Sequence, residues 1–223
     1  MDKSLVDKTK KVIESVSKME SIRPYILVGG TALSLQIANR LSEDLDFMRW
    51  QQYHGERMDI DIKSITRELE SGHVTDRINI LDSNQVEVFI DGGVKLSFYA
   101  PERKAPQINK VRFLNNLYLA DIDTIASLKL EVMQRRNSFR DYYDLYCIFK
   151  ERSNEEIIRI IDNSLKYSGH VMKSKNLLGK LGNYERFTKD EAFKQLAPKY
   201  DISSREIAEF MDQKVKTAYK SRK

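Results

Sequence analysis

The sequence predicts an α+β fold, with a mixed β-sheet core in the first half and a helical second half. Three observations indicate this fold class. A short apolar run ends in a glycine pair, Gly29-Gly30, and leads into a segment with helical spacing. Three segments between positions 73 and 99 alternate apolar and polar residues, as half-buried strands do. Beyond position 120 the apolar residues recur at helical spacing. We therefore expect two domains, residues 1–120 and 121–223.

Length and composition limit what the chain can be. Its 223 residues carry a formal net charge of +5, which suits a polyanionic partner without demonstrating one. The single cysteine, Cys147, excludes an internal disulfide framework and a multi-cysteine zinc site, and we expect it to be a small buried apolar residue. No apolar run approaches the length of a membrane span, and the N-terminus lacks the apolar core of a signal peptide. We therefore expect a cytoplasmic protein with no membrane partner.

The first elements surround the glycine pair. Apolar residues at helical spacing predict a scaffold helix over 3–20, and Pro24 then begins the first strand, which continues to position 28. Because glycine has no Cβ, the pair allows this strand to turn sharply into a helix. That helix is expected to continue to about Arg40, and residues 44–49 form the next strand.

Strands dominate the rest of the first half. A short helix over 63–70 is expected after the triplet Asp59-Ile60-Asp61. The Asp91-Gly92-Gly93 turn between two alternating runs predicts a hairpin. The expected strands are 73–81, 85–90, 94–99, an edge strand at 108–114 and a short extension at 117–120.

Helices are expected throughout the second half. One follows the triplet Asp121-Ile122-Asp123 and runs to about Arg136, and another begins at Phe139. The later helices are expected at 155–167, 177–181, 189–196 and 203–219. Both acid triplets, 59–61 and 121–123, directly precede a helix. We therefore interpret them as helix-capping segments, with 59–61 as the rival metal site.

Asp44 and Asp46 form the strongest candidate site. A strand alternates its side chains, so the two carboxylates share one face while Leu45 and Phe47 pack behind them. Two adjacent acids repel one another unless a cation lies between them, and Mg²⁺ prefers oxygen ligands. The alternative is a pair of ordinary surface acids on an edge strand. The glycine turn favours a metal site, because the helix N-terminus that follows it can hold phosphate.

These residues also resemble a known family. The stretch from Val28 to Met48 is similar to the first motif of the AbiEii/AbiGii-type toxin nucleotidyltransferases of bacterial type IV toxin–antitoxin and phage-defence systems, within the nucleotidyltransferase superfamily. The matching residues are Gly29-Gly30-Thr31-Ala32-Leu33, Arg40, Ser42 and Asp44-Leu45-Asp46-Phe47. A glycine pair or an Asp-x-Asp alone is a weak signal, but the combination at this spacing is specific. The resemblance covers roughly residues 20–150.

The resemblance implies roles for individual residues of the first domain. Asp44 and Asp46 would be catalytic and would bind Mg²⁺, or Mn²⁺ in its place. The residues implied to bind the nucleotide are Gly29, Gly30, Thr31, Arg40 and Ser42. From the residues alone, Thr31 is equally well explained as a helix cap, and Arg40 as half of a structural ion pair.

In the second domain, Lys129 and the segment 140–146 resemble the family's downstream lysine and aspartate motifs. The resemblance implies that Lys129 holds a nucleotide phosphate and that Asp141 or Asp144 acts as a general base or orients the lysine. The helical domain would thereby complete the active site. The two aspartates lie three residues apart and therefore share one helix face. Periodicity alone favours another arrangement, with Leu145 inward and both acids in solvent.

One position departs from the superfamily pattern. Many nucleotidyltransferases carry a third carboxylate on a later strand, and the matching position here is Ser97. We expect Val94, Leu96 and Phe98 to face the core, which leaves Ser97 and its neighbour Lys95 on the other face. If this register is wrong, Glu87 or Asp91 becomes the candidate for the third acid.

The resemblance implies an NTP-dependent nucleotidyltransferase that transfers a nucleoside monophosphate to RNA, tRNA being a plausible acceptor, as a toxin controlled by a cognate antitoxin. The basic second half either contacts an RNA backbone or is a solvated lysine-rich surface. Its basic residues include Lys166, Lys173, Lys175, Lys180, Lys189, Lys194, Lys199, Lys220, Arg222 and Lys223. Two alternatives remain open. One is transfer to a protein or small molecule, and the other is a degenerate domain that binds NTP or RNA without turnover.

Overall fold

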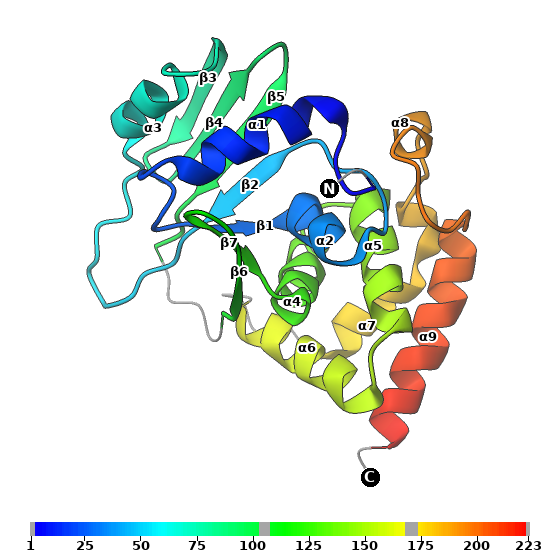
Figure 1. Cartoon of the computed structure of the whole chain (residues 1–223). Helices are drawn as coiled ribbons and strands as arrows, with labels where there is room; N and C mark the ends of the chain where they lie inside the picture. The colour runs from blue at the N-terminus through cyan, green and yellow to red at the C-terminus, as the bar shows by residue number, and fades with distance from the viewer. Residues whose placement is uncertain (1–2, 103–107, 168–173, 222–223) are drawn as a thin grey trace. The chain divides into compact units, whose positions relative to one another are not determined.

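The three-dimensional arrangement comes from a computed structural model that describes residues 3–102, 108–167 and 174–221 (Figure 1). The chain divides into two units, Met1–Asp121 and Ile122–Lys223. The first unit holds all the strands of the described residues, and the second is helical. The predicted α+β class, with a mixed sheet followed by a helical part, is confirmed.

A seven-stranded mixed sheet forms the centre of the first unit, in the order β3-β4-β5-β2-β1-β7-β6. β2 pairs antiparallel with β1 and parallel with β5, and β1 pairs parallel with β7. β6 is an edge strand, as predicted. The strands are β1 Ile26–Val28, β2 Leu45–Met48, β3 Thr75–Asp82, β4 Gln85–Ile90, β5 Val94–Tyr99, β6 Lys110–Leu114 and β7 Leu117–Ala120.

The register between β2 and β5 determines which side chains share a face of the sheet. Leu45 is aligned with Leu96 and Phe47 with Phe98, and all four are buried. The Phe47 and Phe98 rings stack with centroids 5.1 Å apart. Because side chains alternate along a strand, Asp46 and its aligned partner Ser97 lie on the opposite face. The predicted inward orientation of β5 is therefore confirmed.

The helices of the first unit, among the residues that the structure describes, are α1 Asp7–Lys18, α2 Gly29–Ile37 and α3 Ile62–Leu69. α2 packs on β1 and β2, and α1 packs on β5 (Figure 1). The carboxylate of Asp61 caps α3, because it accepts hydrogen bonds from the Ser64 backbone N–H at 3.1 Å and from its hydroxyl at 2.7 Å. The capping role predicted for Asp61 is confirmed.

The second unit is built from helices around an aromatic core. Tyr142 stacks on Phe187 at 4.3 Å, and Phe193 contacts both Phe139 and Tyr143 edge-on. The first helix ends at Val132, four residues earlier than the sequence predicted. The helices are α4 Ile122–Val132, α5 Phe139–Lys150, α6 Asn154–Tyr167, α7 Ser174–Gly182, α8 Glu191–Lys194 and α9 Ser204–Lys220, with a short 3-10 helix, η1, at Tyr184–Arg186. No helix of the described residues is long and apolar enough to cross a membrane.

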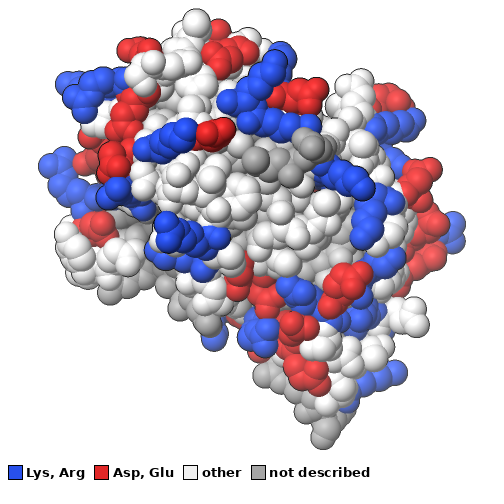
Figure 2. Space-filling model, viewed as in Figure 1, with Lys and Arg blue, Asp and Glu red and all other residues white. Residues whose placement is uncertain are grey.

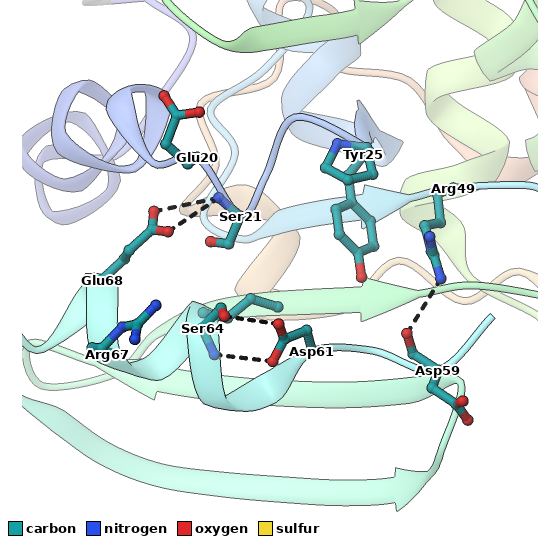
Figure 3. A pocket seen from close by; sticks show the side chains of 11 residues that line it. Glu20, Ser21, Tyr25, Arg49, Asp59, Asp61, Ser64, Arg67 and Glu68 are labelled. Atoms are coloured by element: carbon teal, nitrogen blue, oxygen red, sulfur yellow. Dashed lines mark hydrogen bonds between the residues drawn. The ribbon is translucent and has the colours of Figure 1, made fainter. Parts of the chain in front are cut away.

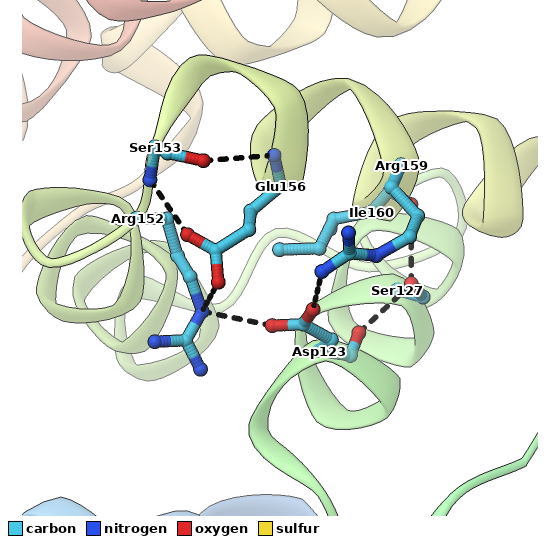
Figure 4. Close-up of polar contacts among 7 residues, drawn as sticks. All are labelled: Asp123, Ser127, Arg152, Ser153, Glu156, Arg159 and Ile160. Carbon is cyan, nitrogen blue, oxygen red and sulfur yellow. Dashed lines mark hydrogen bonds and ion pairs between the residues drawn. The ribbon is translucent and has the colours of Figure 1, made fainter.

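Asp123, in the first turn of α4, links this helix to α6 (Figure 4). Its carboxylate pairs with Arg152 Nε at 2.8 Å and with Arg159 Nη2 at 2.7 Å. On the same side, the Ser127 hydroxyl donates to the carbonyl of Ile160 at 3.1 Å. The second acid triplet therefore contributes an ion pair between helices of the second unit, which capping alone does not describe.

Candidate functional site

The glycine pair makes the turn from β1 into α2 and brings the backbone close to two polar side chains. Gly29 has φ = 71°, a left-handed conformation that favours glycine. A Cβ at Gly29 would lie 2.7 Å from Oδ2 of Asp46. A Cβ at Gly30 would collide with the guanidinium of Arg40. A Cβ at either position would thus displace a polar side chain, and Gly29 is also favoured by its backbone conformation.

Thr31, Arg40 and Ser42 are buried beneath this turn. The Thr31 hydroxyl donates to the carbonyl oxygen of Asp44 and lies within hydrogen-bond distance of Ser42 Oγ, at 2.9 Å. Arg40 donates from Nη1 to the carbonyl of Leu41 at 2.9 Å. The fully buried Thr31 therefore ties α2 to the residue that precedes β2, and it positions Asp44 through the backbone.

Asp44 and Asp46 lie at the same end of the sheet as the glycine turn, and both are partly exposed. Lys95, on the neighbouring strand β5, places its Nζ 3.2 Å from Oδ2 of Asp44. Burial lowers the pKa of Lys95, but the negative charges of Asp44 and Asp46 outweigh it, and the net pKa is raised. The acidic pair and this ammonium thus form one charge cluster on one face of the sheet.

The donor set of the acidic pair fits a hard divalent cation. Carboxylate oxygens are the ligands that Mg²⁺ prefers, and Mg²⁺ commonly takes one or two carboxylates together with phosphate oxygens. Among the described residues, no group of three or more Asp, Glu, His or Cys side chains is arranged to hold a metal. Asp44 and Asp46 would therefore leave most of the coordination shell to a substrate and water.

A second charge cluster is buried in the second unit. Lys129 of α4 places its Nζ 2.7 Å from Oδ1 of Asp141 and 2.8 Å from Oδ2 of Asp144, both on α5. Arg136 also donates to Asp141, with Nε 2.8 Å from Oδ2. Burial raises the pKa of Asp141, but the charges of Lys129 and Arg136 outweigh it and hold the pKa below its usual value.

This cluster decides between the two arrangements that the sequence left open for α5. The carboxylate side chains of Asp141 and Asp144 are 5% and 0% exposed, so the arrangement with both acids in solvent is wrong. Leu145 is buried as well, because α5 is covered on nearly all sides. Cys147 is buried, as predicted.

The rival acids lie elsewhere in the first unit. β1 and β2 are antiparallel, so Tyr25 and Arg49 mark the end of this strand pair that lies away from the glycine turn. A pocket of about 390 Å³ lies there, lined in part by Tyr25, Arg49, Asp59 and Asp61 (Figure 3). The Asp59 carboxylate pairs with Arg57 at 2.9 Å. The triplet 59–61 is therefore separate from the Asp44–Asp46 pair.

The two acids considered as substitutes for a third carboxylate also have local partners. Glu87 is aligned with Ser97 on β4 and accepts a hydrogen bond from Asn79 Nδ2 at 3.2 Å. Asp91 accepts hydrogen bonds from the backbone N–H of Val74 at 3.0 Å and lies 2.6 Å from Nδ1 of His73. Ser97 itself is next to Asp46, so the register gives the third-acid position to a serine.

Sequence reasoning missed two cations of these clusters, Lys95 and Arg136. Lys95 alternates with Ser97 on β5, so its face was predictable, but its contact with Asp44 depends on the pairing of β5 with β2. Arg136 lies five residues before Asp141, beyond the end of α4, where helical spacing no longer predicts neighbours.

The basic residues of the second half are partly neutralised by local partners. Lys189 pairs with Asp201 at 2.6 Å and Lys194 with Glu191 at 2.8 Å, while Lys180 donates to the carbonyl of Gln134 at 2.7 Å. Lys173, Arg222 and Lys223 lie outside the described residues. On the face in Figure 2, lysine and arginine side chains are interspersed with acidic ones. This face has both signs of charge and no single basic field.

Comparison with known proteins identifies similar chains. The family model of the nucleotidyl transferase AbiEii toxin of type IV toxin–antitoxin systems matches residues 15–220. An uncharacterized protein of Aquifex aeolicus, aq_aa25, is 24% identical over 219 residues, 96% of this chain and 97% of that protein. The crystal structure of JHP933 from Helicobacter pylori has a TM-score of 0.61 at 20% identity, covering 98% of this chain and 94% of that one. MenT4, a nucleotidyltransferase toxin from Mycobacterium tuberculosis H37Rv, has a TM-score of 0.53 at 13% identity, covering 94% and 82%.

Proposed function

Because the chain belongs to the nucleotidyl transferase AbiEii toxin family of type IV toxin–antitoxin systems, we propose that it transfers a nucleoside monophosphate from an NTP to RNA in a reaction that requires Mg²⁺. The family match confirms the resemblance found in the motifs and identifies the chain as a nucleotidyltransferase. The observation that carries the proposal is the partly exposed Asp44–Asp46 pair beside the Gly29-Gly30 turn. We also propose a cognate antitoxin as its protein partner.

The chemistry follows from the residues of the first unit. Nucleotidyl transfer forms a bond between an acceptor oxygen and the α-phosphorus and breaks the bond to the β-phosphate, so pyrophosphate leaves and the acceptor proton passes to a base or to water. Asp44 and Asp46 would hold Mg²⁺, or Mn²⁺, which stabilises charge on the phosphates when bound. The N-terminus of α2, opened by Gly29 and Gly30, offers backbone N–H groups to a phosphate.

The proposed nucleotide site is supported from beneath by Thr31, Arg40 and Ser42. All three are buried, and the hydrogen bonds of Thr31 link the glycine turn to Asp44. Arg40 lies against Gly30, where a guanidinium adds positive charge beneath the proposed phosphate position. We propose that these residues set the geometry of the nucleotide site.

Lys129, Asp141 and Asp144 form the functional centre that we propose for the second unit. An ammonium that contacts two carboxylates at 2.7 and 2.8 Å is fixed in position. The resemblance to the family implies that the Lys129 ammonium holds a nucleotide phosphate. A carboxylate of Asp141 or Asp144 that is released from this ammonium is a suitable general base. If Lys129 acts on the transition state, Lys129→Arg lowers kcat more than it raises the KM for NTP.

RNA is the proposed acceptor because the chain is basic overall and belongs to a toxin family. The test incubates the purified protein with each α-labelled NTP, Mg²⁺ and total RNA, and separately with a protein extract. Label is expected in RNA, in the tRNA size range, and a chelator abolishes it. Increasing salt weakens the modification, because binding to an RNA backbone releases counterions.

The other outcomes distinguish the alternatives. Label in a protein band would indicate that the acceptor is a protein and not RNA. Bound NTP without label in any fraction, with every NTP and with Mg²⁺ or Mn²⁺, contradicts turnover and makes the domain a nucleotide binder, as the serine at position 97 would allow.

A further inference from the structure

Lys95 is a cation built into the acidic site by the pairing of two strands. β5 runs parallel to β2 with Leu96 aligned to Leu45. Lys95 and Asp44 each precede one of these two aligned residues, so they also come together. Lys95 Nζ lies 3.2 Å from Asp44 Oδ2. Lys95 shares its face of the sheet with Ser97, which is aligned with Asp46. The ammonium is thus placed at the acidic pair by register rather than by a flexible approach.

Lys95 is surrounded by carboxylates, so its ammonium acts as a counter-ion to them. Its side chain is 28% exposed and that of Asp44 is 38% exposed, so the pair is partly screened from solvent. The charges of Asp44, Asp46 and Glu87 all act on Lys95. Two neighbouring carboxylates repel one another unless a positive charge compensates them. Lys95 contributes positive charge to that compensation in the protein alone.

Lys95 opposes the binding of a metal ion to the acidic pair when no nucleotide is present. A divalent cation at Asp44 and Asp46 would meet an ammonium a few ångströms away, and like charges at that distance repel one another in a partly solvated site. No third carboxylate of the described residues is arranged to hold the cation together with this pair. Binding of the cation without nucleotide is therefore disfavoured, whereas phosphate oxygens that accompany the cation also offer the ammonium a new partner.

We propose that Lys95 is the resident counter-ion of the Asp44–Asp46 pair, that it competes with a divalent cation for Asp44, and that its ammonium passes to a nucleotide phosphate when metal and nucleotide bind together. This inference rests on the proposed function, because it assumes that the acidic pair takes a metal–nucleotide complex. It assigns Lys95 a positioning role in the free protein and a phosphate-binding role in the complex.

The test uses one substitution, Lys95→Met, which keeps a long side chain and removes the charge. Mn²⁺ binding to the protein alone, measured by electron paramagnetic resonance, is expected to become about tenfold tighter. Binding of a non-hydrolysable NTP analogue with Mg²⁺, measured by calorimetry, is expected to become about tenfold weaker, since a phosphate loses a charged partner. One residue thus moves the two affinities in opposite directions.

Two control variants separate this effect from a change in overall charge. Lys95→Arg retains the cation and is expected to keep the weak Mn²⁺ binding of the wild type. Lys63→Met removes an exposed lysine of α3 and leaves both affinities unchanged. Equal Mn²⁺ affinity of wild type and Lys95→Met overturns the inference, while label transfer by the wild type leaves the proposed function standing. Absence of Mn²⁺ binding in every variant, with and without nucleotide, contradicts the proposed metal site itself.

Discussion

Removal of Lys129 is expected to destabilise the second unit severely at neutral pH. The side chains of Lys129, Asp141 and Asp144 are 7%, 5% and 0% exposed, and the ammonium lies within 2.8 Å of both carboxylates. Taking away one partner of a buried ion pair leaves uncompensated charge and costs about 3–5 kcal/mol. Lys129→Met should therefore lose about that much unfolding free energy, a large part of the roughly 5–15 kcal/mol of a typical domain.

The destabilisation caused by Lys129→Met is expected to depend on pH. In the wild type the pKa of Asp141 is lowered, so its stabilising contribution is present at neutral pH and is lost only as the pH falls through that lowered pKa. In Lys129→Met the carboxylates lose a cation, and burial raises their pKa values instead. Protonation of these carboxylates as the pH falls then removes the uncompensated charge, and the difference between variant and wild type should shrink.

Urea unfolding at pH 7.5 and pH 5, followed by circular dichroism, measures both effects. Lys166→Met, which removes an exposed lysine of the same unit, is the control and should change stability by less than about 0.5 kcal/mol. A loss below about 1 kcal/mol for Lys129→Met, or a loss that is the same at both pH values, would refute the reasoning that the cluster is a buried, charge-compensated centre.

Three further predictions concern the first unit. Gly29→Ala should destabilise the protein by more than about 1 kcal/mol and reduce label transfer, because alanine is strained at this positive φ and its Cβ would press on Asp46. Wild-type stability and transfer in this variant would contradict the prediction. Thr31→Val should cost about 1–3 kcal/mol in urea unfolding, since the carbonyl of Asp44 loses its donor, and a neutral effect would remove Thr31 from the support of β2. Asp61→Ala should cost about 1 kcal/mol through the lost cap of α3 and leave transfer intact, so an inactive variant would place this acid in the chemistry.

The fold was largely predictable because its signals are local. Alternation predicted the strands at 85–90 and 94–99 without error in their bounds, and the Asp-Gly-Gly turn joins them as a hairpin. The order of the strands was not predictable, since β2 lies between β1 and β5 through pairings that no local pattern encodes. The helix after position 121 ends four residues early, and the chain continues from Val132 to Arg136 in hydrogen-bonded turns, which the sequence pattern does not distinguish from a helix.

In the candidate site, too, the features encoded locally were predictable and those that depend on strand or helix packing were not. The acidic pair and the glycine turn were visible as a motif within one short stretch, and the face on which Ser97 lies followed from alternation. The partner of Asp44 was not visible, because Lys95 is fifty-one positions away and reaches it only through strand register. The burial of Asp144 was also unpredictable, since α5 lacks a polar face only in its tertiary setting.

The most direct test of the account is label transfer by the two variants Asp44→Asn and Asp46→Asn. Each keeps the size of the side chain and removes the negative charge that a divalent cation requires. Asp59→Asn is the matched control, since this acid lies at the separate pocket. Thermal melting of all three should resemble that of the wild type. We predict that transfer of label from NTP to RNA falls to background in the first two variants and persists in the control. Wild-type turnover in Asp44→Asn or Asp46→Asn would contradict the claim that this pair carries the reaction.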